Sequence, residues 1–510
     1  MAFIAKRAVS GPVSLPAPVG GWNARDALPN MSPLDAVILT NWFPATTECV
    51  LRSGYTRFAT GLPGQVETLM PYAGGTTNRL FAISDNKVYN VTSGGAVGAA
   101  VLTGLSNSRF ESCNVTNSAG TSYLVFANGA DTPRLYDGST FTTASITGTG
   151  LTASKLDQPL TFMNRLWFVE TGTMKVWYLG TQAVTGAATA IDISAYAYKG
   201  GYIVDHATWT IDAGDGVNDH YVIVTSKGQV VVFQGSDPSS ATTWGMKGVW
   251  DIGSPIGKRS MYKYAGDLLI ICEDGLVPMS QALQSSRINP KISLTDKIQY
   301  QVSQVISSYG SNFGWQTVYV PHLNQLWLNV PIETGKNQQQ YVMNTITGAW
   351  CNYTGWDANC WLIYNDLPYF GGNGFVGLAW NTLADNGTNI EGFALQAFNN
   401  FGKAGKLKRY TMSRPILRSN GSPAILAGIN VDFNIAQPTT SLTYTPVSYG
   451  SWDNALWDAA TWGGDLNVVQ NWQGINGVGY YAAPIVKVAS QGIQTTWVGT
   501  DIVMEEGAIL

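Results

Sequence analysis

The chain has 510 residues, and only 12% of them are Asp, Glu, Lys or Arg, well below the ~25% typical of globular proteins. Glycine occurs 56 times, and Trp, Tyr and Phe together make up 12%. This composition predicts an all-β protein and argues against a coiled coil, a largely helical chain and a disordered chain. The net charge of -4 lacks the basic footprint of a general nucleic-acid binder.

Residues 1–65 are predicted to form an extended N-terminal arm with one short helix, packed on a C-terminal domain. Ser32-Pro33 is typical of a helix N-cap followed by the first helical position. Apolar residues follow at helical spacing, namely Leu34, Val37 and Ile38. Asn41-Trp42-Phe43-Pro44 then ends the helix, because a residue before proline avoids the α region.

Targeting and membrane segments are not expected. The start, MAFIAKRAVSGPVSLPAPVGG, has no apolar stretch behind its basic pair, and three prolines interrupt it. This pattern does not fit a secretory signal peptide. Nothing in the chain approaches the ~18 apolar residues that a membrane span needs. We therefore expect no membrane span and a chain that is made and kept soluble.

Residues 66–400 repeat a unit of short alternating strands separated by turn residues. One recurring strand marks the repeat: Lys87-Val88-Tyr89, Arg134-Leu135-Tyr136, Lys175-Val176-Trp177 and Val231-Val232-Phe233, with weaker versions around Met279, Met343 and Leu378. A spacing of roughly 40–50 residues with about four strands per unit is typical of a β-propeller blade. The sequence thus predicts a propeller of six or seven blades.

The clearest blade covers residues 315–355. Four strand-like stretches follow one another there: WQTVYVP, QLWLNVP, QYVMN and AWCNY. One helix, 295–309, is predicted as an insertion into the repeat. Thr295 is its expected cap, and apolar residues recur behind it at helical intervals.

Residues 401–510 are predicted to form a platform-like β domain, a sandwich by its strand content, to which the N-terminal arm could add strands. Its first part is basic, and no acid occurs between Glu391 and Asp432. The basic residues are Lys403, Lys406, Lys408, Arg409, Arg414 and Arg418. Three interpretations stay open for them: a solvated face, a contact between subunits, or a phosphate-facing lining of a DNA channel.

Other motifs point to structure and not to chemistry. Residues 372–377 match G-x-G-x-x-G, but the following residues continue as a strand, so a hairpin is the better interpretation. The three histidines lack ligand-spaced partners, and the acidic turn 212–219 lacks the order of an EF-hand. The five cysteines are scattered without a C-x-x-C pair, which favours free thiols. We predict no catalytic, cofactor or metal site, and no enzyme.

Three parts of the chain resemble one known family. The N-terminal part has Gly20-Gly21-Trp22-Asn23-Ala24-Arg25, Asn41-Trp42-Phe43-Pro44 and Leu51-Arg52-Ser53-Gly54-Tyr55. The middle part has Gly235-Ser236-Asp237-Pro238-Ser239-Ser240 with Trp244, Ile252-Gly253-Ser254-Pro255-Ile256-Gly257-Lys258-Arg259 and Gly275-Leu276-Val277-Pro278-Met279-Ser280. The late part has Ala397-Phe398-Asn399-Asn400-Phe401-Gly402 and Met412-Ser413-Arg414-Pro415. Together they resemble the tail nozzle proteins of short-tailed bacteriophages, also called tail tubular B or hub proteins. These motifs are structural turns and not catalytic signatures.

The resemblance implies a virion structural protein of the phage tail, assembled in the host cytoplasm. It implies a β-propeller on a platform-like domain, with six copies in a hexameric ring below the portal and the adaptor, or head-to-tail connector. Such a ring continues the DNA channel, keeps it closed until infection and opens for genome ejection. Its other implied partners are tail fibre proteins and double-stranded DNA, which passes without sequence recognition. The family has no catalytic residues to carry over, and no cofactor is implied.

A second hypothesis comes from a different class of protein. Residues 235–244 loosely resemble the Asp-box turn of sialidase propellers, and the chain is rich in aromatic residues. A glycan-binding or glycan-hydrolysing propeller that recognises a host is therefore the alternative. Hydrolysis would need two carboxylates facing each other, which spacing along the sequence does not reveal.

Overall fold

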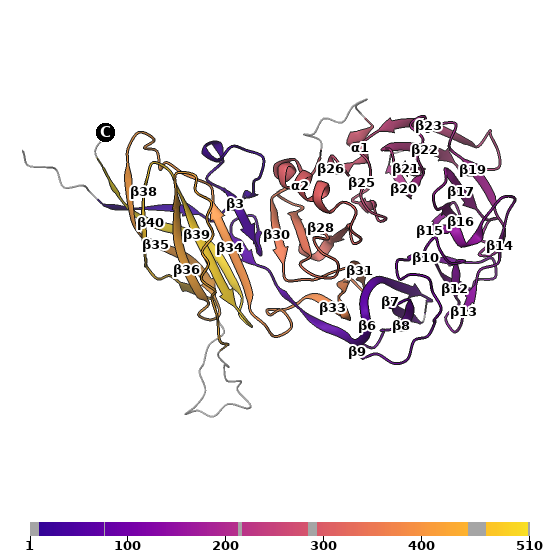
Figure 1. Cartoon of the computed structure of the whole chain (residues 1–510), viewed down its shortest axis with the longest axis horizontal. Helices are drawn as coiled ribbons and strands as arrows, with labels where there is room; N and C mark the ends of the chain where they lie inside the picture. The colour runs from indigo at the N-terminus through magenta and orange to yellow at the C-terminus, as the bar shows by residue number, and fades with distance from the viewer. Residues whose placement is uncertain (1–9, 76, 213–216, 284–292, 447–465, 508–510) are drawn as a thin grey trace, which may run out of the picture.

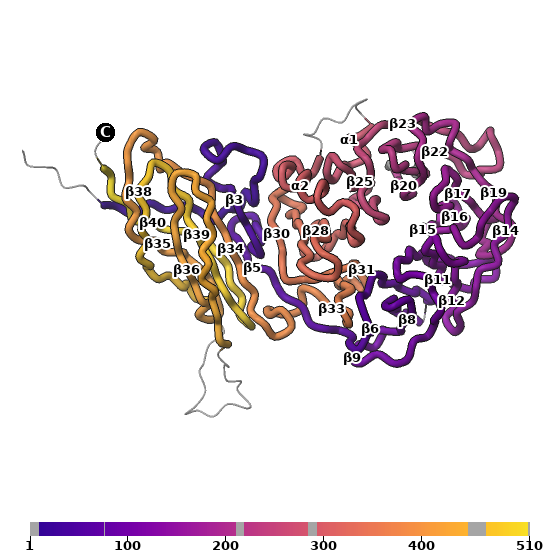
Figure 2. The backbone as a smooth tube through the Cα atoms, viewed as in Figure 1, coloured from indigo at the N-terminus to yellow at the C-terminus, as the bar shows by residue number. Residues whose placement is uncertain are grey.

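The structure is a computed structural model that describes residues 10–75, 77–212, 217–283, 293–446 and 466–507. These residues are mostly β, and many of their strands form small antiparallel sheets. Figure 1 shows two units side by side: a ring of small sheets, and two larger sheets that carry the orange and yellow C-terminal strands. We call them the sheet ring and the stacked sheets. In Figure 2 the indigo N-terminal chain runs from the stacked sheets into the sheet ring.

Seven groups of antiparallel strands make up the sheet ring in the described part of the chain. Group 1 consists of β6 (Gly54–Ala73), β7 (Asn78–Ser84) and β8 (Lys87–Asn90), group 2 of β10 (Glu111–Thr116), β11 (Ser122–Ala127), β12 (Arg134–Tyr136) and β13 (Phe141–Thr143), and group 3 of β15 (Leu156–Phe162), β16 (Arg165–Glu170), β17 (Lys175–Tyr178) and β19 (Thr189–Asp192). Group 4 consists of β20 (Ile203–Asp212), β21 (Val217–Thr225), β22 (Gln229–Gly235) and β23 (Trp244–Asp251), and group 5 of β24 (Met261–Tyr264), β25 (Asp267–Cys272) and β26 (Gly275–Pro278). Group 6 consists of β27 (Gln316–Val320), β28 (Gln325–Val330), β29 (Gln339–Asn344) and β30 (Trp350–Thr354), and group 7 of β31 (Cys360–Tyr364), β32 (Leu367–Gly371) and β33 (Asn373–Thr382). The first strands of successive groups contact one another in turn, from β6 through β10, β15, β20, β24, β27 and β31 back to β6. These first strands therefore surround a common axis.

One long strand closes the sheet ring. The first part of β6 pairs with β33, the last strand of group 7, and its second part pairs with β7 of group 1. Gly54 is required at the start of this junction, because a Cβ there would lie 1.9 Å from the carbonyl oxygen of Ala384. Closure of this kind leaves no free strand edge at the junction, where β6 lies between β33 and β7.

The recurring marker strand of the sequence occupies one repeated position. Four of its copies lie in β8, β12, β17 and β22, and Met343 and Leu378 lie in β29 and β33, each the third strand of its group. Met279 is the first residue of the short helix α1 (Met279–Ala282), directly after the third strand β26. The hairpin expected at residues 372–377 is confirmed, because β32 and β33 pair antiparallel across it.

The predicted four-strand unit at 315–355 is confirmed as β27, β28, β29 and β30. The predicted helix is confirmed as well: a 3-10 turn, η4 (Asp296–Ile298), leads into α2 (Gln299–Tyr309), which buries Val302, Val305 and Ile306. Thr295 is at the expected N-cap position, but its side chain does not cap the helix. The Thr295 hydroxyl makes no capping hydrogen bond and instead accepts one from the Leu276 amide at 3.3 Å.

A nine-stranded sheet joins the sheet ring to the stacked sheets. Its order is β27-β28-β29-β30-β3-β34-β39-β36, with β2 on β3. The strands outside group 6 are β2 (Gly21–Trp22), β3 (Asp35–Thr40), β34 (Ile390–Gln396), β36 (Ala424–Val431) and β39 (Ala482–Ser490). β3 pairs with β30 through Thr40 and Asn352, and with β34 over several residues. The joint between the two units is thus a continuous sheet.

A seven-stranded sheet forms the second layer. Its strands are β1 (Gly11–Pro16), β4 (Trp42–Pro44), β5 (Cys49–Leu51), β35 (Lys408–Ser419), β37 (Asn467–Val469), β38 (Gln473–Gly479) and β40 (Thr495–Glu506). Three of them, β1, β4 and β5, come from the N-terminal arm. The remaining short elements are β9 (Gly95–Ala96), β14 (Ile146–Thr147), β18 (Gly186–Ala187), η1 (Leu28–Asn30), η2 (Ala153–Lys155) and η5 (Pro321–Leu323).

The predicted helix at residues 33–38 is wrong, because this segment is strand β3. Its Ala36 and Leu39 are completely buried, and its backbone pairs with β34. The Ser32 hydroxyl accepts a hydrogen bond from the Leu34 amide at 3.2 Å, so it closes a local turn and caps no helix. Pairing with strands distant in sequence therefore outweighs the local helical pattern.

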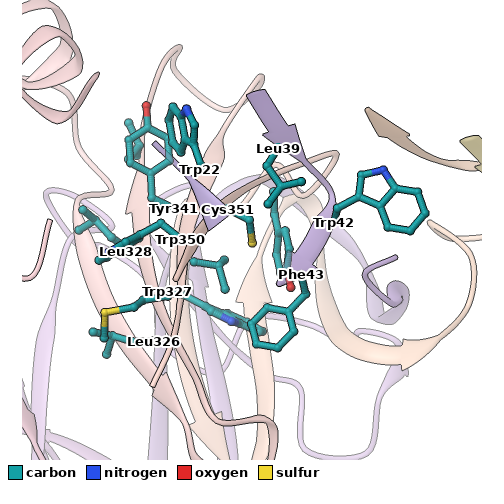
Figure 3. Close-up of a cluster of buried hydrophobic side chains, with 14 of the residues drawn as sticks. Trp22, Leu39, Trp42, Phe43, Leu326, Trp327, Leu328, Tyr341, Trp350 and Cys351 are labelled. Carbon is teal, nitrogen blue, oxygen red and sulfur yellow. The ribbon is translucent and has the colours of Figure 1, made fainter. Parts of the chain in front are cut away.

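The largest hydrophobic core spans the joint between the units. Figure 3 shows Trp22 next to Tyr341, with ring centroids 5.2 Å apart, and Trp42 and Phe43 on the strand that follows Leu39. Trp42 also packs on Trp497 of β40, at 5.7 Å between rings. Aromatic residues of the N-terminal arm thus fill the space between the sheet ring and the stacked sheets, which holds the two units together.

Candidate functional site

The basic residues of 403–418 lie on β35 and in the turn before it, and most are bound to other groups of the same chain. Lys403 and Lys406 both form ion pairs with Glu506, Lys406 at 3.0 Å. Lys408 is 1% exposed, and its Nζ donates to the carbonyl oxygens of Tyr480 at 2.8 Å and Lys406 at 3.0 Å. Burial lowers the pKa of Lys408. These three lysines anchor the end of β40 and the turn before β39.

Arg414 and Arg418 are paired in a similar way. Arg414 bonds to Asp501 at 2.5 Å, and its guanidinium lies 4.6 Å from the ring centre of Trp472. Burial by itself would raise the pKa of Asp501, but hydrogen bonds from Ser14 and Arg414 outweigh it and lower that pKa. Arg418 forms an ion pair with Glu48 of the N-terminal arm.

Acids from distant parts of the sequence therefore neutralise most of this basic run. Arg409 is exposed, and its register partner on β40 is Glu505. A phosphate held here would compete with carboxylates already in place, which weakens electrostatic binding. A role for the six residues in subunit contacts or in a DNA channel stays a prediction.

A denser charged cluster lies on the axis of the sheet ring, built around the loop 252–260 between β23 and β24. Arg259 carries most of its contacts. Its Nε donates to Glu111 Oε1 at 2.6 Å, and its Nη2 donates to the carbonyl oxygens of Phe110 at 3.1 Å and Glu67 at 3.3 Å. Burial by itself would lower the pKa of Arg259, but the charge and hydrogen bond of Glu111, together with other neighbouring groups, outweigh burial and raise that pKa. Arg259 thus links groups 1 and 2 to a loop that follows group 4.

Lys258 extends the cluster toward group 3. Its Nζ lies 2.8 Å from Asp157 Oδ2 and donates to the Arg109 carbonyl oxygen at 2.9 Å. The Gln158 side chain in turn donates to the Lys258 carbonyl oxygen at 2.8 Å. Burial raises the pKa of Asp157 despite the Lys258 charge. We call the side chains of Glu67, Arg109, Glu111, Asp157, Asp205, His206, Lys258 and Arg259 the axial cluster.

Asp205 and His206 form its part on group 4. Asp205 Oδ2 accepts from the Met261 amide at 2.9 Å and from the Ser260 hydroxyl at 3.2 Å. Burial raises the pKa of Asp205 to about 7 and lowers that of His206 to about 4. His206 Nε2 faces the Gln158 carbonyl oxygen at 2.5 Å, so this nitrogen carries the proton. The other ring nitrogen accepts from the Tyr221 hydroxyl, which makes His206 a neutral bridge between strands.

Phe313, which precedes group 6, lies between two arginines of the axial cluster. Its ring centre is 4.5 Å from the Arg109 guanidinium and 5.2 Å from that of Arg259. Arg109 also pairs with Glu67 at 3.0 Å. Ion pairs thus link groups 1, 2 and 3 on the axis, and cation–π contacts add Phe313, which lies ahead of group 6. Each acid of the axial cluster is held by a cation or by hydrogen-bond donors, an arrangement that suits a structural plug.

The other motifs occupy structural positions. His322 is exposed in η5, and His220 lies on β21 with its ring 5.8 Å from that of Trp209. The turn 235–244 joins β22 to β23, and its Asp237 pairs with Arg165 at 3.1 Å. Part of the acidic turn 212–219 lies outside the described residues. Within the described residues, no three His, Cys, Asp or Glu side chains are placed to hold a metal ion.

All five cysteines are free thiols in the structure. Four are buried, and Cys113 is partly exposed. Burial raises the pKa of Cys113, Cys272 and Cys360 to about 12. Thiols with such pKa values are protonated and unreactive at neutral pH. Among the described helices, none is both long and apolar enough to cross a membrane.

Sequence reasoning assigned no role to Arg52, which holds the ring closure together. Its side chain is 1% exposed and pairs with Asp385 at 2.6 Å, next to the end of the β6–β33 ladder. It also bonds to Asn41 Oδ1 at 2.9 Å, and its guanidinium lies 4.7 Å from the Trp356 ring. The signal in the sequence is that Arg52 follows two apolar residues, Val50 and Leu51, within the resembling stretch Leu51-Arg52-Ser53-Gly54-Tyr55.

Comparisons with known proteins add the following. No family model matches the chain, and no curated protein matches it. Among solved structures, it is similar to the crystal structure of BBS1N in complex with ARL6DN, soaked with lead, at 10% identity and a TM-score of 0.38, covering 66% of this chain and 99% of that one. It is also similar to Raptor from Chaetomium thermophilum, at 12% identity and a TM-score of 0.35, covering 67% and 29%. Likeness at this level carries no argument about function.

Proposed function

We propose that the sheet ring is a seven-bladed β-propeller and that the stacked sheets are a sandwich-like platform. Three observations support this. Seven strand groups follow one another in the chain, their first strands contact each other in a closed circuit, and β6 joins the last group to the first. Propellers have their innermost strands around a central axis, as the first strands lie here.

We further propose that the protein is a virion structural protein, the nozzle or hub of a short phage tail. The placement of the resembling stretches carries this proposal. Trp22 and Trp42 fill the joint between the units, Arg52 holds the ring closure, and Lys258 and Arg259 form the plug on the axis. The resemblance thus falls on residues that hold the architecture together, as expected for a family defined by a building block and not by a reaction.

The plug affects how DNA would pass. Lys258 and Arg259 occupy the axis of the sheet ring with ion pairs to two surrounding strand groups. DNA would therefore run between neighbouring copies of the chain and not through the propeller of one copy. In the proposed hexamer, six copies enclose the channel below the adaptor, and tail fibre proteins dock on the outside.

Two further properties support the proposal. A charged fraction of 12% suits a chain whose faces are covered by neighbours, because interface cores are depleted of charge. The net charge of -4 suits a conduit, because a basic lumen would hold DNA through many phosphate contacts. The channel would open for genome ejection without any chemical step.

Immunogold electron microscopy of purified phage particles, with an antibody against this chain, tests the proposal. Label confined to the distal end of a short tail is the expected result. Particles without label, or label on radiating fibres, would overturn it. A non-immune antibody on the same particles is the matched control for background labelling.

A further inference from the structure

A pocket of about 390 Å³ with a mixed polar and apolar lining lies between groups 3 and 4, beside the plug loop. Ligand sites usually have volumes of ~300–1,000 Å³, so the pocket matches a small ligand. Its polar lining residues include Asp157, Gln158 and Lys258, and its apolar ones include Val169 and Ile203. The function proposed above does not use this pocket.

The charged groups of the pocket compensate each other. Asp157 and Lys258 are the charged side chains among its lining residues, and they pair at 2.8 Å. An anion would have to compete with Asp157 for the lysine, and a cation would have to compete with Lys258 for the carboxylate. A neutral ligand competes with neither partner of this ion pair, so the Asp157–Lys258 pair favours a neutral polar molecule.

The remaining polar groups suit hydroxyl ligands. Ser226 Oγ accepts from the Tyr202 amide at 3.2 Å, which leaves its own O–H able to donate to a ligand. Lys258 Nζ uses two of its three N–H groups on Asp157 and Arg109. Thr171 adds an exposed hydroxyl at the mouth. The pocket thus offers both hydrogen-bond donors and hydrogen-bond acceptors, which suits hydroxyl groups, because each hydroxyl can donate and accept.

Tyr202 supplies an aromatic surface beside these polar groups. It lines the pocket and is 49% exposed. One face of a sugar ring carries C–H groups, which pack on an aromatic ring while the hydroxyls reach polar partners. We propose that this pocket binds a neutral saccharide, with Tyr202 against the ring face and with Asp157, Lys258 and Ser226 bonding to hydroxyls.

The pocket lining fits a site that binds a saccharide and does not hydrolyse it. Glycoside hydrolysis needs two carboxyl groups facing the same bond. Asp157 is the one carboxylate among the pocket-lining residues, and it pairs with Lys258 at 2.8 Å. The saccharide would therefore leave the pocket unchanged.

Saturation-transfer NMR on the purified full chain tests this inference. The probes are the methyl glycosides of glucose, galactose, mannose and N-acetylglucosamine, with glucose 6-phosphate and N-acetylneuraminic acid as anionic probes, all at millimolar concentration. We expect transfer to at least one neutral probe and about tenfold weaker binding of it by Tyr202→Ala. Tyr198→Ala is the matched control, because Tyr198 is 71% exposed and does not line the pocket.

Three outcomes would overturn the inference: no transfer to any neutral probe, tighter binding of an anionic probe, or equal losses in Tyr202→Ala and Tyr198→Ala. Circular dichroism of both variants verifies that each is folded. A second variant, Thr171→Trp, adds bulk at another pocket-lining position while Tyr202 is kept, and should also abolish transfer. The assay uses the isolated chain, so its outcome is independent of the particle labelling that tests the nozzle proposal.

Discussion

Replacing Arg259 by Met is the sharpest test of the axial cluster. The change removes the guanidinium but keeps most of the apolar stem. Arg259 is 12% exposed and Glu111 22%, so Glu111 would keep a largely buried charge without its partner. Breaking a buried ion pair costs about 3–5 kcal/mol. Because Glu111 retains some solvent contact, we expect the lower end, a loss of about 3 kcal/mol in the free energy of unfolding.

Arg109→Met is the matched control for this variant. Arg109 contacts the same Phe313 ring and pairs with Glu67, but its side chain is 49% exposed. Glu67 is 17% exposed, but its partner Arg109 lies in solvent, which brings this pair closer to the surface range of about 0–1 kcal/mol, so this variant should lose about 1 kcal/mol, less than Arg259→Met. The two variants thus compare a buried arginine with an exposed arginine around one aromatic ring.

Urea unfolding followed by tryptophan fluorescence measures both losses. Adding Glu111→Gln to Arg259→Met removes the stranded charge, so the double variant should regain about half of the loss. Equal losses in the Arg259 and Arg109 variants would refute the argument. So would a double variant that is less stable than Arg259→Met alone, because the stranded carboxylate would then not be the cause.

Three further predictions follow from the geometry. Arg52→Met should lower the free energy of unfolding by about 3–5 kcal/mol in urea titrations, because it strands Asp385 at the ring closure. The pKa of Asp205 is about 7 in the folded protein, whereas the unfolded chain has the ordinary, lower pKa of an aspartate, so wild-type stability should fall as the pH rises between these two values. Asp205→Asn should remove this fall in urea titrations across that pH range. Lys408→Ala should cost about 1 kcal/mol in thermal unfolding, because two partly buried carbonyl oxygens lose their donor. Arg409→Ala, at an exposed site, should stay within about 0.5 kcal/mol.

Each of these has a result that would contradict it. An Arg52→Met protein as stable as the wild type would mean that Asp385 finds water or another donor. A pH slope retained in Asp205→Asn would assign the titration to another group. Equal losses in Lys408→Ala and Arg409→Ala would show that the burial of Lys408 has no energetic role.

The sequence predicted the parts of the fold that depend on local patterns. Glycine turns and a recurring aliphatic–aromatic strand located the repeat, and apolar spacing located the helix at 299–309. The same kind of pattern failed at 33–38, where Leu34, Val37 and Ile38 follow a helical spacing but pairing with β34 makes a strand. Local spacing could not reveal a partner strand that lies in the C-terminal part of the chain.

The candidate site was less predictable, because its contacts join distant residues. The run at 403–418 appeared unpaired in sequence, since Glu48, Asp501 and Glu506 lie far from it along the chain. Lys258 and Arg259 were noted as part of a resembling motif, but nothing local showed that they reach Asp157 and Glu111. The charge of a residue can be read from sequence, whereas its neutralisation depends on the fold.

The closing strand β6 also sets an order of events during synthesis. Its first part emerges from the ribosome early, but its partner β33 is made only after the other groups of the sheet ring. Until then, residues 54–65 lack their β33 partner and have only the short pairing of Ala59 and Thr60 with β9. Bringing these segments together late makes ring closure a slow, non-local step. A nascent chain released before residue 382 would therefore expose unpaired strand edges, which promote aggregation. We expect synthesis of this protein to depend on chaperones and to be sensitive to premature termination.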